Sequence, residues 1–174
     1  MPTKRLVAHA VLAAAVLILS SCENAGSIAG GGSGSDYSVA RQALETGNYN
    51  LAIRRYENLL TRVNPATAAR LQLEYAHSLL RANRFSEAIQ ATGVIVDRPD
   101  DSIRGLALAV RGTARHELAR QLMAQGERDA RTRQLLEGAR DDLAYFLGQH
   151  NALDSGGSMR ARSQLVLSDL GQVS

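Results

Sequence analysis

Few side chains in this sequence are of types that do chemistry, and their spacing argues against a metal site. Apart from His9 near the start of the chain, the histidines stand far apart: His77, His116 and His150. The one cysteine is Cys22. A zinc site usually needs two ligands close together on one element, as in His-Glu-x-x-His, but Arg120 stands where the second histidine after His116 would be. We therefore expect that the protein holds no metal and no cofactor.

Other catalytic arrangements are missing as well. A phosphate-binding loop needs Gly-Lys, and the single lysine, Lys4, stands near the start of the chain. The sequence has no Gly-x-Ser-x-Gly motif. Asp141 and Asp142 are adjacent, as are Asp100 and Asp101, and neighbours on a helix point about 100° apart instead of converging. We therefore expect that the protein is not an enzyme.

The beginning of the chain has the features of an export signal that ends at Cys22. Two positive residues, Lys4 and Arg5, precede an apolar run over residues 6–18, which is shorter than the roughly 20 residues that span a bilayer. The Leu-Ser-Ser-Cys motif that ends at Cys22 resembles the lipobox of bacterial lipoproteins. The resemblance implies a signal peptide over residues 1–21 and an acylated Cys22 that anchors the protein in a membrane. A plain signal peptide or an N-terminal membrane anchor are the alternatives.

The residues after the cysteine predict where the folded domain lies. Glu23 follows Cys22 in place of an aspartate, which in enteric bacteria resembles the sorting signal for the outer membrane. The segment 22–35 is rich in Gly and Ser and has too little apolar surface to fold, so it predicts a flexible linker. We expect an outer-membrane lipoprotein that faces the periplasm, with its folded domain over residues 36–172.

Length and composition favour a single helical domain that does not bind nucleic acid. The 174 residues suffice for one domain. Hydrophobic residues make up 45% of the chain but aromatic residues only 4%, so the core must be built from Ala, Leu, Val and Ile, which favours helices. The net charge of +3 includes Lys4 and Arg5 of the signal peptide. The remaining chain is close to neutral, whereas a groove for nucleic acid needs a clear basic excess.

From Tyr37 onward, similar residues recur at an interval of 36. The matched sets are Ala40, Ala76 and Gly112; Gly47 and Asn83; Tyr49 and Phe85; Ala52 and Ala88; and Ile53 and Ile89. Apolar and small residues flank Gly47 and Asn83 at helical spacing, and both residue types tolerate the left-handed conformation that ends a helix. Each unit therefore predicts two helices joined by a tight turn. Pro65 and Pro99 are expected to close the second helix of each unit.

This pattern resembles the tetratricopeptide repeat, a helix-turn-helix unit of about 34 residues. The residues that carry the resemblance are Gly47, Tyr49, Ala52, Ile53, Tyr56 and Pro65 in the first unit and Tyr75, Ala76, Leu79, Phe85, Ala88 and Pro99 in the second. The third unit is longer by about four helical turns, so we expect two lengthened helices with Gly126 near their tip. A last amphipathic helix, Met159 to Leu170, would cap the stack.

The predicted fold is therefore an all-α, tetratricopeptide-like array of about three helical hairpins with a C-terminal capping helix. An irregular helical bundle is the alternative. In tetratricopeptide proteins the first helices line a concave groove that binds peptides or partner helices. The resemblance implies a partner-binding groove lined by Tyr37, Arg41, Glu45, Arg70, Leu73, Glu74, His77, Arg81, Leu106, Val110, Thr113 and His116. Alternatively, these residues form ordinary solvated helix surfaces.

These features together predict a protein-protein interaction adaptor or assembly factor at the outer membrane. The chain is similar in architecture to small repeat lipoproteins that serve pilus and secretion machines. An adaptor that regulates cell-wall hydrolases is the alternative. Beyond Cys22 the chain has 18 Arg and no Lys. The planar guanidinium group suits carboxylate recognition, but a GC-rich genome is the favoured explanation of the bias.

Overall fold

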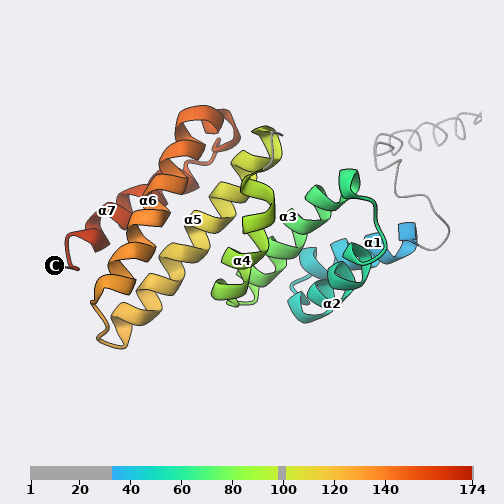
Figure 1. Cartoon of the computed structure of the whole chain (residues 1–174), viewed down its shortest axis with the longest axis horizontal. Helices are drawn as coiled ribbons and strands as arrows, with labels where there is room; N and C mark the ends of the chain where they lie inside the picture. Colours follow the sequence, from blue (N-terminus) through green and yellow to red (C-terminus); the bar gives the residue numbers. More distant parts are fainter. Residues whose placement is uncertain (1–32, 98–100, 174) are drawn as a thin grey trace, which may run out of the picture.

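The structure, a computed structural model, describes residues 33–97 and 101–173, and this part of the chain is all-α. Its elements are α1 (Ser33–Glu45), α2 (Tyr49–Leu60), α3 (Pro65–Arg81), α4 (Phe85–Val96), α5 (Asp101–Ala124), α6 (Ala130–His150), the short 3-10 helix η1 (Asn151–Leu153) and α7 (Ser158–Leu170). Each helix packs against its neighbour in the chain, and α3 also packs against α5, which gives an elongated stack (Figure 1). The predicted signal peptide and Cys22 lie outside the described residues. Within the described ranges, none of the helices has the length and apolar character needed to cross a membrane.

The turns between the paired helices have the left-handed backbone that the sequence predicts. Gly47, between α1 and α2, has φ of +81°, and Asn83, between α3 and α4, has φ of +59°. Asn48 then caps α2, because its side-chain oxygen accepts a hydrogen bond of 3.3 Å from the backbone N–H of Leu51. Gly126, between α5 and α6, has φ of +86°. The predicted turns at Gly47 and Asn83 are confirmed, and Gly126 lies between the two long helices, as predicted.

Pro65 does not close a helix, contrary to the sequence prediction. The helix α2 ends at Leu60, and Pro65 is the first residue of α3. The side chain of Asn64 caps this start by accepting a hydrogen bond of 3.0 Å from the backbone N–H of Thr67. Proline suits this position because the first N–H of a helix has no partner within the helix. Pro99 lies outside the described residues.

The folded part extends slightly beyond the predicted range 36–172. The helix α1 starts at Ser33, within the predicted linker. Asp36 stands in its first turn, where a carboxylate suits the helix dipole, and pairs with Arg55 of α2 at 3.2 Å. At the other end, Val173 is buried against side chains of α5 and α6.

Small residues allow the helices to approach closely. Ala40 and Ala76 are fully buried at equivalent places in α1 and α3, and Gly112 is buried at the matching place in α5. A Cβ atom added to Gly112 would lie 3.0 Å from Cγ of Leu143 and 3.3 Å from the carbonyl oxygen of Ala139. The longer third pair, with 24 residues in α5 and 21 in α6, therefore packs without room for a larger side chain at this crossing.

The last helix, α7, packs across α6 and α5, and its extent agrees with the predicted Met159 to Leu170. Val166 is fully buried, in contact with Ala139 and Leu143 of α6. Asp154 caps the start of α7 by accepting a hydrogen bond of 2.9 Å from the backbone N–H of Met159, and such bonds lower the pKa of the Asp154 carboxyl.

Candidate functional site

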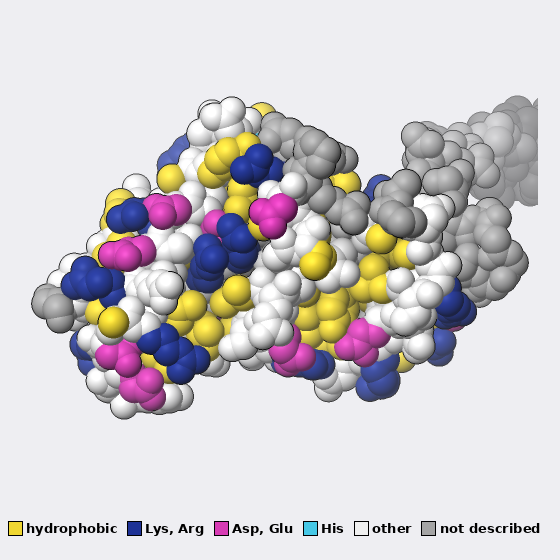
Figure 2. Space-filling model, in the orientation of Figure 1, with side chains coloured by type: hydrophobic (Ala, Val, Ile, Leu, Met, Phe, Trp, Pro, Cys, Tyr) yellow, Lys and Arg dark blue, Asp and Glu magenta, His cyan; other side chains and the backbone are white. Residues whose placement is uncertain are grey.

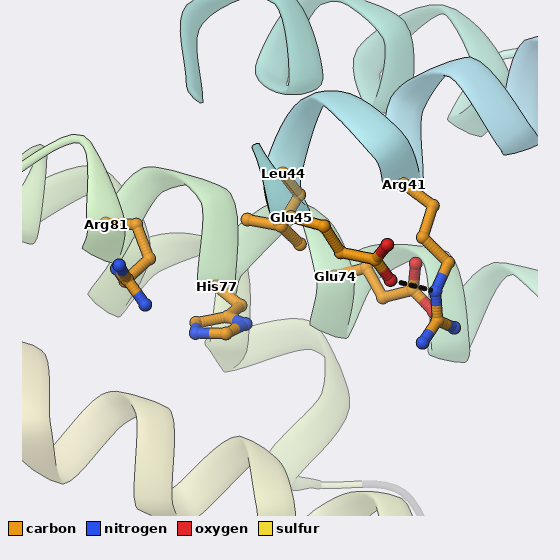
Figure 3. A pocket seen from close by; sticks show the side chains of 6 residues that line it. All are labelled: Arg41, Leu44, Glu45, Glu74, His77 and Arg81. Atoms are coloured by element: carbon orange, nitrogen blue, oxygen red, sulfur yellow. Dashed lines mark hydrogen bonds and ion pairs between the residues drawn. The ribbon is translucent and has the colours of Figure 1, made fainter. Parts of the chain in front are cut away.

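A hollow of about 360 Å³ lies between α1 and α3, and we call it the α1–α3 hollow. Its lining consists of Arg41, Leu44 and Glu45 from α1 and Glu74, His77 and Arg81 from α3. Figure 3 shows these side chains facing the space between the two helices. The lining includes Arg41, Glu45, Glu74, His77 and Arg81 of the sequence-predicted groove. The structure thus brings part of that set together at one place.

Glu74 links three helices at the edge of the hollow. Its Oε1 accepts hydrogen bonds from the hydroxyl of Tyr37 at 2.9 Å and from Nε of Arg70 at 3.3 Å. Its Oε2 accepts one from the hydroxyl of Tyr56 at 2.6 Å. Burial and then the bond to Glu74 raise the pKa of Tyr56 well above its usual value, so the phenol stays protonated and donates. Glu74 and Tyr37, both predicted to contact a partner, therefore bond within the chain.

Arg41 and Glu45 pair along one turn of α1. The two side chains are exposed, and Nε of Arg41 lies 2.9 Å from Oε1 of Glu45. Hydrogen bonds to Tyr37 and then to Glu45 raise the pKa of the Arg41 guanidinium. An exposed pair of this kind contributes little to stability, but it leaves the charge of Glu45 balanced within the protein.

Arg81 is held by an aromatic ring and not by a carboxylate. Its Nη2 donates a hydrogen bond of 2.7 Å to the hydroxyl of Tyr49, and its guanidinium carbon lies 5.2 Å from the centre of the Tyr49 ring. Within the part of the chain that the structure describes, Arg81 forms no ion pair with an acidic side chain. The guanidinium is therefore positioned but not neutralised.

His77 lies between Glu74 and Arg81 on the hollow side of α3 and is half-buried. Burial lowers the pKa of its imidazole, and the positive charge of Arg81 lowers it further, while Glu74 acts in the opposite direction. His77 is therefore neutral at pH 7 and can donate or accept a hydrogen bond.

The apolar residues predicted to line the groove further along have different environments. Leu73 is half-buried against a core cluster that includes Ile95 and Leu108. Val110 packs against the cluster between α3 and α4. Leu106, on α5, is 39% exposed and is the most exposed of these three.

Thr113 and His116 do not line a groove, contrary to the sequence prediction, because α7 covers them. The hydroxyl of Thr113 lies 3.8 Å from the sulfur of Met159. His116 has no exposed surface, and its Nε2 lies 2.9 Å from Oδ2 of Asp169 while its Nδ1 lies 3.2 Å from Nη1 of Arg162. Both residues therefore belong to the contact between α5 and α7.

Three residues of the site were not predicted from the sequence. Leu44 lines the hollow, and its place three residues after Arg41 on a helix could have indicated this. Tyr49 and Tyr56 hold Arg81 and Glu74, and a buried phenol generally needs a hydrogen-bond partner, but the sequence does not identify that partner.

Metal-ligand side chains do not cluster in the described ranges, and the adjacent acids Asp141 and Asp142 have different surroundings. No group of three or more His, Cys, Asp or Glu side chains there is arranged to hold a metal ion. The side chains of Asp141 and Asp142 diverge as predicted, with 67% and 5% of their surface exposed. Asp142 instead binds Arg111 at 2.7 Å and Arg115 at 2.8 Å, and burial lowers the pKa of Arg115. This carboxylate therefore joins α5 to α6.

The face of the molecule in Figure 2 carries acidic and basic side chains intermixed, with hydrophobic side chains between them. This face has no continuous basic surface of the kind that tracks nucleic-acid phosphates. Comparisons with models of known protein families, with curated proteins and with solved structures find no match to this chain. The geometry of the α1–α3 hollow is therefore the basis for assigning a function.

Proposed function

We propose that this protein is a tetratricopeptide-like adaptor that binds a segment of a partner protein across the α1–α3 hollow. The observation that carries the proposal is the hollow itself, in which charged, neutral polar and apolar side chains from two helices surround one space. In ligand-binding sites, a few polar groups fix the orientation of the ligand and apolar groups supply contact area.

Two observations support the tetratricopeptide-like arrangement. The left-handed turn residues Gly47 and Asn83 stand one repeat apart, and each connects a pair of packed helices. The small residues Ala40 and Ala76, also one repeat apart, are both fully buried at helix contacts. Local backbone geometry and packing therefore repeat with the interval found in the sequence.

We propose binding and not catalysis as the role of the hollow. Glu74 is bonded to two phenols and to Arg70, and Glu45 is paired with Arg41. Carboxylates held in this way fix the shape and charge of a surface. General acid or base catalysis would need one of them poised to exchange a proton with a substrate.

We also propose that acylation of Cys22 holds this domain at the periplasmic side of the outer membrane. The Leu-Ser-Ser-Cys motif and the Gly/Ser-rich segment before α1 support this anchor. Pilus and secretion machines of the envelope, which similar repeat lipoproteins serve, are the first source in which to seek the partner.

Site-specific photo-cross-linking in the bacterium that encodes the chain tests the binding role. A benzophenone amino acid replaces Leu44 or His77, which line the hollow, or Arg131, which is exposed on α6, as the control. We expect both hollow positions to cross-link the same envelope protein, identified by mass spectrometry, and the control position not to do so. Equal cross-linking from Arg131, or none from the hollow, would overturn the proposal.

A further inference from the structure

Two arginines, Arg41 and Arg81, and two carboxylates, Glu45 and Glu74, line the α1–α3 hollow. Arg41 pairs with Glu45 at 2.9 Å, and Arg70 pairs with Glu74 at 3.3 Å. Arg81 is therefore the arginine of this lining that has no carboxylate partner among the described residues, and His77, whose pKa is lowered by burial, adds no positive charge at pH 7.

The guanidinium of Arg81 is held in place by contacts that use only part of its hydrogen-bond donors. One of its five N–H donors bonds to the hydroxyl of Tyr49 at 2.7 Å, and the ring of Tyr49 supports it at 5.2 Å. Arg81 is an exposed residue, so its other donors face solvent or the hollow. A planar guanidinium with free donors matches the two oxygens of a carboxylate.

The α1 side of the same hollow supplies one apolar side chain. Leu44 of α1 is half-buried there, across from His77 and Arg81 of α3. A ligand that fits both sides carries a negative group next to an apolar side chain. A segment of a polypeptide can carry a negative side chain and an apolar side chain next to each other in this way.

We infer that the α1–α3 hollow recognises an acidic peptide segment, in which an Asp or Glu carboxylate binds Arg81 and a neighbouring apolar side chain contacts Leu44. The inference rests on the proposed function, because it names the chemistry of the partner segment that the hollow binds. It assigns Arg81 as the residue that determines specificity.

Selection from random dodecapeptides displayed on phage tests this inference. The bait is the acylated full chain in detergent, as wild type, Arg81→Gln, Arg81→Glu and the control Arg128→Gln, which alters an exposed arginine in the turn between α5 and α6. We expect the wild type and Arg128→Gln to enrich peptides with Asp or Glu next to an apolar residue. Arg81→Gln should lose this preference, and Arg81→Glu should select Lys or Arg in its place. Circular dichroism melting establishes that each variant is folded.

A titration with one selected peptide supplies the quantitative test. Replacing its Glu by Gln should weaken binding to the wild type by about tenfold, the size of one charge-assisted hydrogen bond, and should have little effect on binding to Arg81→Gln. If the wild type selects neutral or basic peptides, or Arg81→Gln keeps the acidic preference, the inference is wrong while peptide binding by the hollow stands. If the wild type selects no peptide, the proposed function fails as well.

Discussion

The hydroxyl of Tyr56 donates a hydrogen bond of 2.6 Å to Oε2 of Glu74 and thereby joins α2 to α3. Tyr56 is fully buried, and a buried phenol that lacks an acceptor is costly. The other oxygen of Glu74 accepts from Tyr37 of α1 at 2.9 Å. One carboxylate therefore sets the relative positions of the two helices that form the hollow.

Removing the hydroxyl of Tyr56 should destabilise the protein while the volume of the core stays nearly the same. We expect Tyr56→Phe to lower the free energy of unfolding by about 1–2 kcal/mol, because Glu74 loses a buried hydrogen bond. Urea denaturation at pH 7 measures the change. The matched control is Tyr75→Phe, whose hydroxyl bonds Glu57 at an exposed site and should contribute less than about 1 kcal/mol. Equal losses in the two variants would contradict a special role for Tyr56.

Asp142 and its neighbour Asp141 provide a second comparison within one helix. Asp142 is buried and binds two arginines of α5, whereas Asp141 is exposed and pairs only with Arg140 beside it. We expect Asp142→Asn to lower the free energy of unfolding by about 2–4 kcal/mol, because Arg111 and Arg115 remain partly buried without a counter-charge.

Asp141→Asn is the control for this loss and should change stability by less than about 0.5 kcal/mol. Urea denaturation of both variants makes the comparison. If Asp142→Asn is as mild as Asp141→Asn, the contacts with Arg111 and Arg115 do not hold α5 against α6.

The helices and their turns could be predicted from the sequence because the signals are local. Gly47 and Asn83 end their helices through their own backbone preferences, and the repeat interval confirms each position by the other. Pro65 was assigned to the wrong helix because proline both follows helices and begins them. The preceding Asn64, a good N-cap residue, is the local signal that distinguishes the two cases.

The candidate site could be predicted only in part, since its contacts join distant parts of the chain. Helical spacing places Arg41 and Glu45 on one face, and the repeat register places His77 on the facing helix. The burial of His116, in contrast, depends on Asp169, which lies 53 residues further along. Neither periodicity nor composition indicates that α7 returns to cover that part of α5.

Gly112 offers a test of the close approach between α5 and α6. Alanine normally favours a helix over glycine by about 1 kcal/mol. At Gly112, however, the added Cβ would lie 3.0 Å from Leu143 and 3.3 Å from a backbone oxygen, so we expect Gly112→Ala to destabilise by about 1–3 kcal/mol. Gly93→Ala, in α4 with open space around the new Cβ, should be neutral or stabilising. Thermal unfolding of both variants measures the two effects. If Gly112→Ala is more stable than the wild type, α5 and α6 lie further apart at this crossing than the structure shows.

His116 should make the stability of the protein depend on pH. Arg162 can only donate, so Nδ1 of His116 accepts its hydrogen bond and Nε2 carries the proton that bonds Asp169. Burial, and then the charge of Arg162, lower the pKa of His116 below its usual value, although the bond to Asp169 opposes them; Glu117 beside it favours the charged form slightly. Protonation would place a new N–H against the guanidinium of Arg162.

Whether stability rises or falls with pH depends on which state, folded or unfolded, binds more protons. Unfolded His116 takes up a proton near pH 6.5, whereas the folded form takes it up only at lower pH, so the unfolded state is favoured as pH falls below 6.5. We expect the free energy of unfolding to have its highest value above pH 6.5. Below pH 6.5 it should decrease by at most about 1.4 kcal/mol per pH unit for each such histidine. His77, whose pKa is also lowered, contributes in the same direction. Urea denaturation at several pH values between 5 and 7.5 gives the free energy of unfolding as a function of pH. This free energy should change less steeply with pH in His116→Gln and in His77→Gln than in the wild type. An unchanged slope in His116→Gln would mean that this imidazole titrates alike in the folded and unfolded chains, and that α7 does not bury it in solution.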